Sequence, residues 1–575
     1  MVGQSRGKPH FALKALVAAI FGQRETLLIV TLMLAAVVSL QWSSHAYFSE
    51  LGAHRDEPAH YVTGLLVQDY ITQHATISPL QFTKQFYAHY PKVALGHWPP
   101  FFYLLQAAWS LLFSSSVASV LVLVGLISAL CGSLLGFLVM RSQTLAAGLM
   151  AGLLFVANPV VARVTCEVMA DGLLALLMLA ATLAFVLYLN AEQYAARYSL
   201  LFGLLTTLAF LTKGSAIALV FVPAVVLSMT NKWDVLKKSS FWLAPVLVLL
   251  LCGPWYWLAR NMAAGTWTHP SPRFVYTAHA LHFYFYALRI AIGPMGLALA
   301  AIGLLHSLSI QRRPAEPHTT SAIGLFALLA GVAAVALIVP VGLEPRFIIP
   351  ALPPLVFFAA DGASWVAGRL GQYLPRLQPY RTAVCVILLG LALFFSFNTI
   401  HKEYAGLGDV ADAILGSSSP DYPSVLIASD ANGEGMFVSD MASRRRESDS
   451  VVIRGTKILS DSNWQGTDYR SFDTTPHEIV DRLDALPVAY VVTDHSIAPL
   501  EIFPHQKILD QAIVEYPAFF APLGTFDAIR DGVRHPASLQ LYRFVHSAPP
   551  SRVLRLPMSR MLRSEVELVV PESRR

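Results

Sequence analysis

The sequence predicts a polytopic α-helical membrane protein that carries a separate α/β domain at its C-terminal end. Of the 575 residues, 55% are hydrophobic and only 13% are charged, whereas soluble globular proteins carry about 25% charged residues. Long apolar runs fill most of the chain before residue 400, and a membrane-spanning helix needs roughly 20 such residues. After residue 400, short strand-like runs alternate with polar turns, which is typical of an α/β domain.

About eleven apolar segments are long enough to be expected as membrane spans. They are 27–47, 116–139, 144–161, 169–189, 199–212, 215–230, 241–259, 284–307, 321–340, 347–366 and 382–399. Lys and Arg concentrate in the connections that are cytoplasmic if the N-terminal segment lies inside, and this bias sets the orientation of short loops. The odd number of spans then places the C-terminal region outside.

The domain boundaries follow from these segments. Strand-like runs at 424–429, 451–454 and 489–493, with a helical stretch at 476–486, indicate the α/β domain. The expected parts are a cytoplasmic N-terminal segment (1–26), a transmembrane domain (27–400) whose first exterior loop (48–98) holds interfacial helices, an extracytoplasmic α/β domain (401–550), and a charged, mobile tail (551–575).

Ionisable residues gather at the predicted outer ends of the spans. Such residues are costly at membrane depth, and they mark a functional site or a buried pair. The predicted exterior face holds Asp56, Glu57, Arg163, Glu167, Asp171, Lys213, Arg260, Arg289, Glu344 and Arg346. Their common placement indicates one polar cavity, at the outer leaflet, that contains both carboxylates and cations.

Two helix starts are predicted in the first exterior loop. Proline favours the first helical position and acidic residues favour the helix N-terminus, so Asp56-Glu57-Pro58 predicts a helix with His60 one turn on. The run Trp98-Pro99-Pro100 predicts a second, aromatic-rich helix, which suits the membrane–water interface.

Each of these charged residues also has a purely structural interpretation: helix capping, bracing of a helix end, snorkelling toward water, or a local ion pair. Asp56 and Glu57 could simply cap a helix, and Glu167 with Asp171 could brace Arg163 at a helix end. Lys213 could be a snorkelling lysine, and Arg346 could merely pair with Glu344. The histidines of the first exterior loop, His54, His60, His89 and His97, match no zinc motif. We therefore predict no histidine metal site there.

Taken in order along the chain, these motifs resemble the bacterial protein-mannosyltransferase-like and aminoarabinose-transferase-like families, which are glycosyltransferases of the GT-C fold. The matching segments are Asp56-Glu57, the Pro-Pro-aromatic helix, residues 163–171, Leu211-Thr212-Lys213-Gly214, and Pro345-Arg346-Phe347 with the prolines that follow it. The resemblance covers about residues 25–400. Many relatives have Lys-Pro-Pro where this chain has His97-Trp98-Pro99-Pro100.

The resemblance implies an inverting transfer of a sugar from a polyprenyl-phosphate donor, with no cofactor. Asp56 matches the catalytic acid of the family and would act as general base, a role that requires a positioned carboxylate. Glu57 is the second catalytic candidate and would orient the acceptor or position the cations. His60, Glu167 and Asp171 would position the acceptor or the cations. Arg346, Lys213 and His97 would bind the donor phosphate, because fixed cations stabilise developing negative charge and arginine suits phosphate geometry.

Two rival functions remain open. The first is an oligosaccharide transferase that uses a lipid-diphosphate donor and Mg²⁺ or Mn²⁺ held by Asp56, Glu57 and Asp171, since carboxylates suit these ions. The second is a membrane transporter, although such proteins tend to show internal repeats and this sequence shows none.

The resemblance implies a multi-pass protein of a bacterial inner membrane, with its site and α/β domain in the periplasm. Membrane lipids and the lipid-linked sugar are the expected partners, and a lipid, a glycan or a protein hydroxyl is the acceptor. The net charge of +5 is small for this length and gives no indication of nucleic-acid binding.

Overall fold

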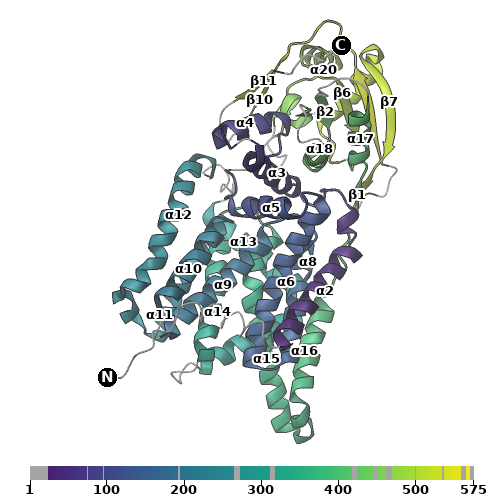
Figure 1. Ribbon diagram of the computed structural model, residues 1–575. Coiled ribbons are helices and arrows are strands. Elements are labelled where there is room, and N and C mark those ends of the chain that lie inside the picture. The colour runs from purple at the N-terminus through teal and green to yellow at the C-terminus, as the bar shows by residue number, and fades with distance from the viewer. Residues whose placement is uncertain are drawn as a thin grey trace.

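The computed structural model describes residues 24–569 except for short gaps. The gaps are 74, 95, 192–194, 264–271, 311–316, 418–423, 445–449, 462–468, 499, 532, 534–536 and 558–564. Most of the segment expected at 1–26 therefore lies outside the described residues. Figure 1 shows a long helical region with a smaller mixed domain at one end of it, and α3, α4 and α5 between the two.

The helical region contains twelve α-helices in the described part of the chain. They are α2 (Arg24–Ser43), α6 (Val117–Ser142), α7 (Leu145–Val156), α8 (Pro159–Thr165), α9 (Asp171–Asn190), α10 (Ala195–Phe210), α11 (Phe221–Thr230), α12 (Ser239–Ala263), α13 (Arg273–Ile310), α14 (Pro317–Ile338), α15 (Leu352–Tyr373) and α16 (Arg381–Ser396). Two 3₁₀ helices, η2 (Gly214–Val220) and η4 (Pro345–Ala351), lead into α11 and α15.

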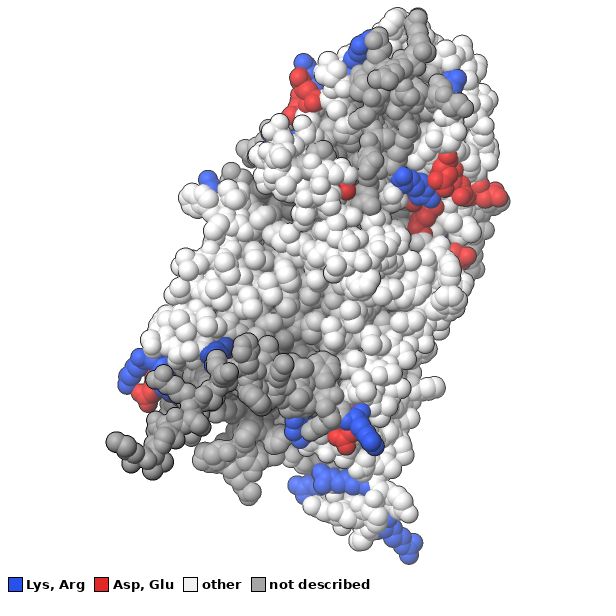
Figure 2. All heavy atoms as spheres, in the orientation of Figure 1, with Lys and Arg blue, Asp and Glu red and all other residues white. Residues whose placement is uncertain are grey.

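Eight helices among the described residues are long and apolar enough to cross a membrane, and the number rises to nine if the bent pair α7–α8 forms one span. The expected count of eleven is not confirmed, because α10 and the segment Gly214–Thr230 are shorter apolar helices. In Figure 2 the described surface across the middle of the helical region shows neither blue nor red, and Lys and Arg gather at its lower end. The chain is thus a multi-span membrane protein.

The segment between α2 and α6 contains three α-helices, of which the helix-start signals predicted two, α3 and α5. Helix α3 (Glu57–Gln73) begins at the Asp-Glu-Pro run and α5 (Phe101–Leu112) begins directly after Pro100. Helix α4 (Pro79–His89) has Pro79 in its first turn and Ser78 as its N-cap, whose hydroxyl accepts a hydrogen bond from the N–H of Gln81. These helices lie between the spans and the C-terminal domain (Figure 1).

The C-terminal domain is built on a five-stranded sheet of order β3-β2-β6-β9-β7. Strands β3 (Val451–Arg454), β2 (Ser424–Ala428) and β6 (Tyr490–Asp494) are parallel, whereas β9 (Ser538–Phe544) runs antiparallel to both β6 and β7 (Phe520–Asp527). Helices α17 (Leu407–Gly416), α18 (Ala431–Arg444), α20 (Pro476–Ala485) and α21 (Pro504–Glu515) complete it. The predicted α/β fold class is confirmed.

The two faces of this sheet pack into different cores, because successive side chains of a strand point to opposite faces. Val425 and Ile427 of β2 belong to the large core that continues into the helical region. Leu426 and Ala428 belong to a smaller core with residues of α20 and α21. The C-terminal domain is therefore joined to the membrane domain through a shared apolar core.

The tail is more ordered than its charge predicts. Strands β10 (Val553–Pro557) and β11 (Glu565–Val569) pair as an antiparallel hairpin. Val566 of β11 packs in a small apolar cluster with Tyr87 and Ala88 of α4. Part of the segment predicted as a charged, mobile tail therefore forms a hairpin whose apolar residues contact α4.

Candidate active site

Asp56 and Arg346 form the centre of a buried charge cluster. Asp56 immediately precedes α3, and its carbonyl oxygen accepts the N–H of His60 at 3.0 Å, which is the first turn of that helix. Arg346 lies in η4 and its Nη2 donates to Asp56 Oδ2 at 2.5 Å, while its Nε donates to Glu344 Oε2 at 2.5 Å. The guanidinium therefore bridges two carboxylates that come from distant parts of the chain.

Lys213 and Asp171 extend the cluster. Asp171 is the first residue of α9 and Lys213 immediately precedes η2. The Lys213 Nζ donates to Asp171 Oδ1 at 2.6 Å, and Arg346 Nη1 lies 3.9 Å from Asp171 Oδ2. The ring of Phe347 lies beneath both cations, 4.8 Å from the Lys213 nitrogen and 5.6 Å from the Arg346 guanidinium carbon. Asp171 and the Phe347 ring thus each lie close to both Lys213 and Arg346, which holds the two cations near each other.

His54 closes the cluster on its more exposed side. Its Nδ1 accepts the backbone N–H of Asp56 at 3.1 Å, so its Nε2 is left to donate toward Glu344 Oε2 at 3.4 Å. Burial raises the pKa of Glu344, but the hydrogen bond from His54 and the charge of Arg346 outweigh it and lower the pKa to about 2. Glu344 is therefore a fixed anion at neutral pH.

His54, Asp56 and Glu344 offer ligand atoms that lie within 4.8 Å of one another, which is close enough for a metal ion. However, both carboxylates already pair with Arg346. A divalent ion there would have to displace or repel the guanidinium. The residues of this cluster therefore do not fit a resident metal ion.

Two predicted histidines lie beside the cluster as neutral rings. Burial lowers the pKa of His60 to about 3 and that of His97 to about 4. His60 stacks on Trp98 at a ring-centroid distance of 4.3 Å, and its Nδ1 lies 2.9 Å from the hydroxyl of Tyr103. His97 packs edge-on against the same Trp98 ring. A neutral His97 supplies a hydrogen bond at most, and not the positive charge that the relatives' lysine would supply.

Glu57 lies apart from the Asp56–Arg346 cluster. Its Oε1 accepts a hydrogen bond from Lys402 Nζ at 2.5 Å and another from the N–H of Val168 at 3.1 Å. Both side chains of the Glu57–Lys402 pair are almost fully buried, with 0% and 1% of their surface exposed. Glu167 lies close by, and burial together with the charge of Glu57 raises its pKa to about 7.

Of the residues selected from the sequence, the structure brings Asp56, Asp171, Lys213 and Arg346 into direct contact, with His60 and His97 beside them. Glu57 and Glu167 belong to a neighbouring buried group. Sequence reasoning missed His54 as a partner of Asp56, and it missed Lys402 altogether. Lys402 had a signal: it follows the last apolar segment directly, and an ionisable residue in that position is costly unless paired.

Comparison with known proteins gives one family match and several structures of similar fold. The family described as dolichyl-phosphate-mannose-protein mannosyltransferase matches residues 97–257, which include His97, Asp171 and Lys213. No curated protein sequence matches the chain. The apo structure of ArnT from Cupriavidus metallidurans aligns with a TM-score of 0.53 and 16% identity, over 91% of this chain and 99% of that one.

A second solved structure has the same architecture. The oligosaccharyltransferase of Archaeoglobus fulgidus, in complex with zinc and sulfate, aligns with a TM-score of 0.52 and 15% identity, over 87% of this chain and 72% of that one. The fold therefore defines the class: this is a membrane protein of the GT-C glycosyltransferase fold. Within that class, residues 97–257 are similar to the mannosyltransferase family named above.

Proposed function

We propose that the protein is an inverting glycosyltransferase that moves a sugar from a polyprenyl-phosphate donor to an extracytoplasmic acceptor. The observation that carries the proposal is the buried Asp56–Arg346 pair, with Lys213 beside it, at the end of the helical region next to the C-terminal domain. It combines a carboxylate able to accept a proton with two cations able to hold a phosphate, inside a glycosyltransferase fold.

In this proposal Asp56 is the general base. Such a base must lie within hydrogen-bond reach of the hydroxyl that it deprotonates. Its Oδ2 is taken by Arg346 in this structure, and the guanidinium fixes the plane of the carboxylate. The acceptor hydroxyl gives its proton to Asp56 as its oxygen attacks the anomeric carbon from the face opposite the lipid phosphate. The C–O bond to the phosphate breaks, and the configuration inverts.

Arg346 and Lys213 hold the departing phosphate. Charge develops on its oxygens as the sugar leaves, and positioned cations stabilise that charge most strongly in a site of low dielectric. Arg346 is 8% exposed and contacts carboxylates on two sides, so its orientation is set before the donor binds. Lys213 would exchange Asp171 for a phosphate oxygen, and neutral His97 would add a hydrogen bond.

The nature of the donor is supported by a protein of the same fold. ArnT from Cupriavidus metallidurans, whose apo form has the architecture described above, has also been solved with undecaprenyl phosphate. A long lipid phosphate suits a site at the end of a membrane-embedded bundle. We place the site and the C-terminal domain on the periplasmic side of an inner membrane, since the Lys- and Arg-rich connections then face the cytoplasm.

The remaining predicted residues take supporting roles. Asp171 positions Lys213 through their ion pair, and His60 positions Asp56 through its backbone N–H, which donates to the Asp56 carbonyl oxygen. Glu57 is assigned a structural role, because its charge is matched by Lys402 and not by a group in the Asp56 cluster. Glu167 belongs to the same structural group.

The alternative to exclude is a metal-dependent transferase, because His54, Asp56 and Glu344 would lie close enough to bind an ion if Arg346 were displaced from the two carboxylates. One experiment separates the two. Protein purified in detergent would be incubated with radiolabelled polyprenyl-phosphate sugars in EDTA, and release of sugar from the lipid would be followed. We expect turnover in EDTA that falls at least about 100-fold in Asp56→Asn, since removing one acid–base group costs 10²–10⁴.

The matched control is Asp234→Asn. Like Asp56, Asp234 pairs with a cation, its Oδ1 lying 2.8 Å from Lys237 Nζ, but both of these side chains are exposed. This variant should turn over like the wild type. Turnover that is lost in EDTA and restored by Mn²⁺ would favour the metal-dependent candidate. Consumption of no carrier sugar by the folded protein, or normal turnover by Asp56→Asn, would overturn the proposed function.

A further inference from the structure

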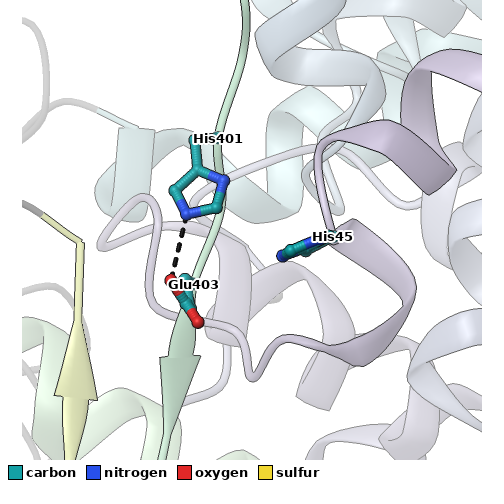
Figure 3. Close-up of side chains that lie close together, drawn as sticks. All are labelled: His45, His401 and Glu403. Atoms are coloured by element: carbon teal, nitrogen blue, oxygen red, sulfur yellow. Dashed lines mark hydrogen bonds and ion pairs between the residues drawn. The ribbon is translucent and has the colours of Figure 1, made fainter.

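A second group of metal-binding side chains lies at the outer end of α2, and the residues assigned to the proposed reaction are not part of it. The group consists of His45, His401 and Glu403 (Figure 3), whose ligand atoms all lie within 4.8 Å of one another. His401 Nε2 is 3.0 Å from Glu403 Oε2, and the rings of His45 and His401 have centroids 5.3 Å apart. The three side chains are exposed, so an ion can reach them from water.

Backbone hydrogen bonds hold the ligands in place without the help of an ion. The N–H of Lys402 donates to the carbonyl oxygen of Ser44 at 2.9 Å, which fixes the residues on either side of Lys402 next to His45. Two further hydrogen bonds join the same two segments: the N–H of Tyr404 donates to the Ser49 hydroxyl at 3.0 Å, and the N–H of Glu50 donates to the carbonyl oxygen of Tyr404 at 2.8 Å. The segment is extended, so alternate side chains point to opposite sides: Lys402 is buried, whereas His401 and Glu403 both face outward.

The conformation of His45 directs its ring into this group. His45 has φ 62° and ψ 15°, and only His45 and Asn231 among the described non-glycine residues have a positive φ. This left-handed conformation is uncommon for a residue with a Cβ. It turns the chain between α2 and the short helix η1 (Ala46–Phe48). Figure 3 shows the His45 ring pointing toward the space between His401 and Glu403.

We propose that His45, His401 and Glu403 bind a divalent transition-metal ion of the Zn²⁺ type, with water as a further ligand. Two imidazoles and one carboxylate are a ligand set that Zn²⁺ accepts, with bonds of about 2.0–2.2 Å. A tetrahedral ion with such bonds holds its ligand atoms roughly 3.4 Å apart. The present separations need only side-chain rotation to reach that value. The one carboxylate of this group, that of Glu403, pairs with no Lys or Arg in the described structure, whereas Asp56 and Glu344 both pair with Arg346.

The ion would tie two distant parts of the chain together. His45 follows the first predicted span, whereas His401 and Glu403 lie in the connection from α16 to the C-terminal domain. The bound ion would thus reinforce the hydrogen bonds between these segments and stabilise the native state, since a ligand that binds only the folded protein raises its stability. The same connection carries Lys402, which reaches into the protein toward Glu57.

The test uses the full chain in detergent, with its purification tag removed. After treatment with a chelator and its removal, the protein would be titrated with ZnCl₂. Bound zinc would be measured by mass spectrometry, and Tm would be followed at each concentration. We expect wild type to bind one ion and its Tm to rise with zinc. We expect His401→Ala and His45→Ala to lose at least about tenfold in affinity, since each removes one of three ligands.

Two control variants make the result specific. His477→Ala removes an exposed histidine whose Nδ1 lies 2.9 Å from Asp481 Oδ2. Among the described residues this pair has no third metal ligand beside it, so the variant should bind zinc like wild type. His54→Ala tests the ion-binding capacity of the Asp56 cluster, and it should also bind like wild type. The proposal is overturned if wild type binds no zinc, if His401→Ala and His45→Ala bind as wild type does, or if zinc binding is lost only in His54→Ala.

Discussion

The buried ion pair of Glu57 and Lys402 leads to a prediction that distinguishes a structural role of Glu57 from a catalytic one. Glu57 adjoins the proposed base, and its sequence position alone makes it a candidate catalytic residue. The structure instead joins it to Lys402 at 2.5 Å, with both side chains almost fully buried. The informative changes are Lys402→Met, which removes the cation and keeps an apolar stem, and Glu57→Gln, which removes the anion and keeps the acceptor for the N–H of Val168.

The magnitude follows from burial. Removing one partner of a buried pair leaves an uncompensated charge and costs about 3–5 kcal/mol, whereas replacing both partners is often close to neutral. Lys402→Met also removes the hydrogen bond from Nζ to the carbonyl oxygen of Cys166, at 3.1 Å. We therefore expect each single variant to lose about 3–5 kcal/mol of unfolding free energy. The double variant should lose less than either single one.

The assay is a double-mutant cycle of unfolding in mixed micelles, followed by the sugar-release measurement on the folded fraction. Lys237→Met is the matched control, because it removes a lysine from an exposed pair with Asp234, and exposed pairs contribute little. Additive losses in the cycle, or a Lys402→Met variant as stable as wild type, would refute the buried-pair reasoning. If the folded double variant lost turnover as severely as Asp56→Asn, Glu57 would be catalytic after all.

Three further predictions concern neighbouring residues. Arg346→Lys keeps a positive charge but loses the fork that bridges two carboxylates; we expect a loss of turnover of about 100-fold with retained folding, measured by sugar release and Tm. Lys213→Met leaves Asp171 without its 2.6 Å partner and removes a phosphate ligand, so the KM for the lipid donor should rise. Glu167 has a pKa raised to about 7 from a usual 4.5, so the folded state binds more protons than the unfolded state between these values. Wild-type stability should fall as pH rises from about 4.5 to about 7, and Glu167→Gln should lose that contribution when Tm is measured across the range.

The membrane fold and the location of the site could be predicted because they rest on strong local signals. Apolar length identifies helices, and a charged residue at the end of such a run is costly enough to need a reason. Asp56, Asp171, Lys213 and Arg346 met that criterion, and the structure brings them together. The number of true spans was not predictable in the same way, since α10 and the segment Gly214–Thr230 are apolar but short.

What could not be predicted is the pairing among these groups. The sequence contains no signal that assigns Arg346 to Asp56 and Lys402 to Glu57 rather than the reverse, because the choice depends on how η4 and the connection after α16 pack. Strands β7 and β9 were also missed, since neither is a continuous apolar run and the pattern of β7 is interrupted by an irregularity between Pro522 and Gly524. The parallel strands of the same sheet are continuous buried runs and were found.

Paired residues in and beside the site lie far apart in the sequence, so they are synthesised at different times. Arg346 is 290 residues later than Asp56, and Lys402 is 345 residues later than Glu57. The first exterior loop therefore emerges early in translation but lacks its charge partners until nearly all spans have been inserted. The hairpin that packs on α4 is synthesised later than every helix of the described structure. The Asp56–Arg346 pair of the proposed site can therefore form only after the segment that carries Arg346 has been made and has packed against the start of α3.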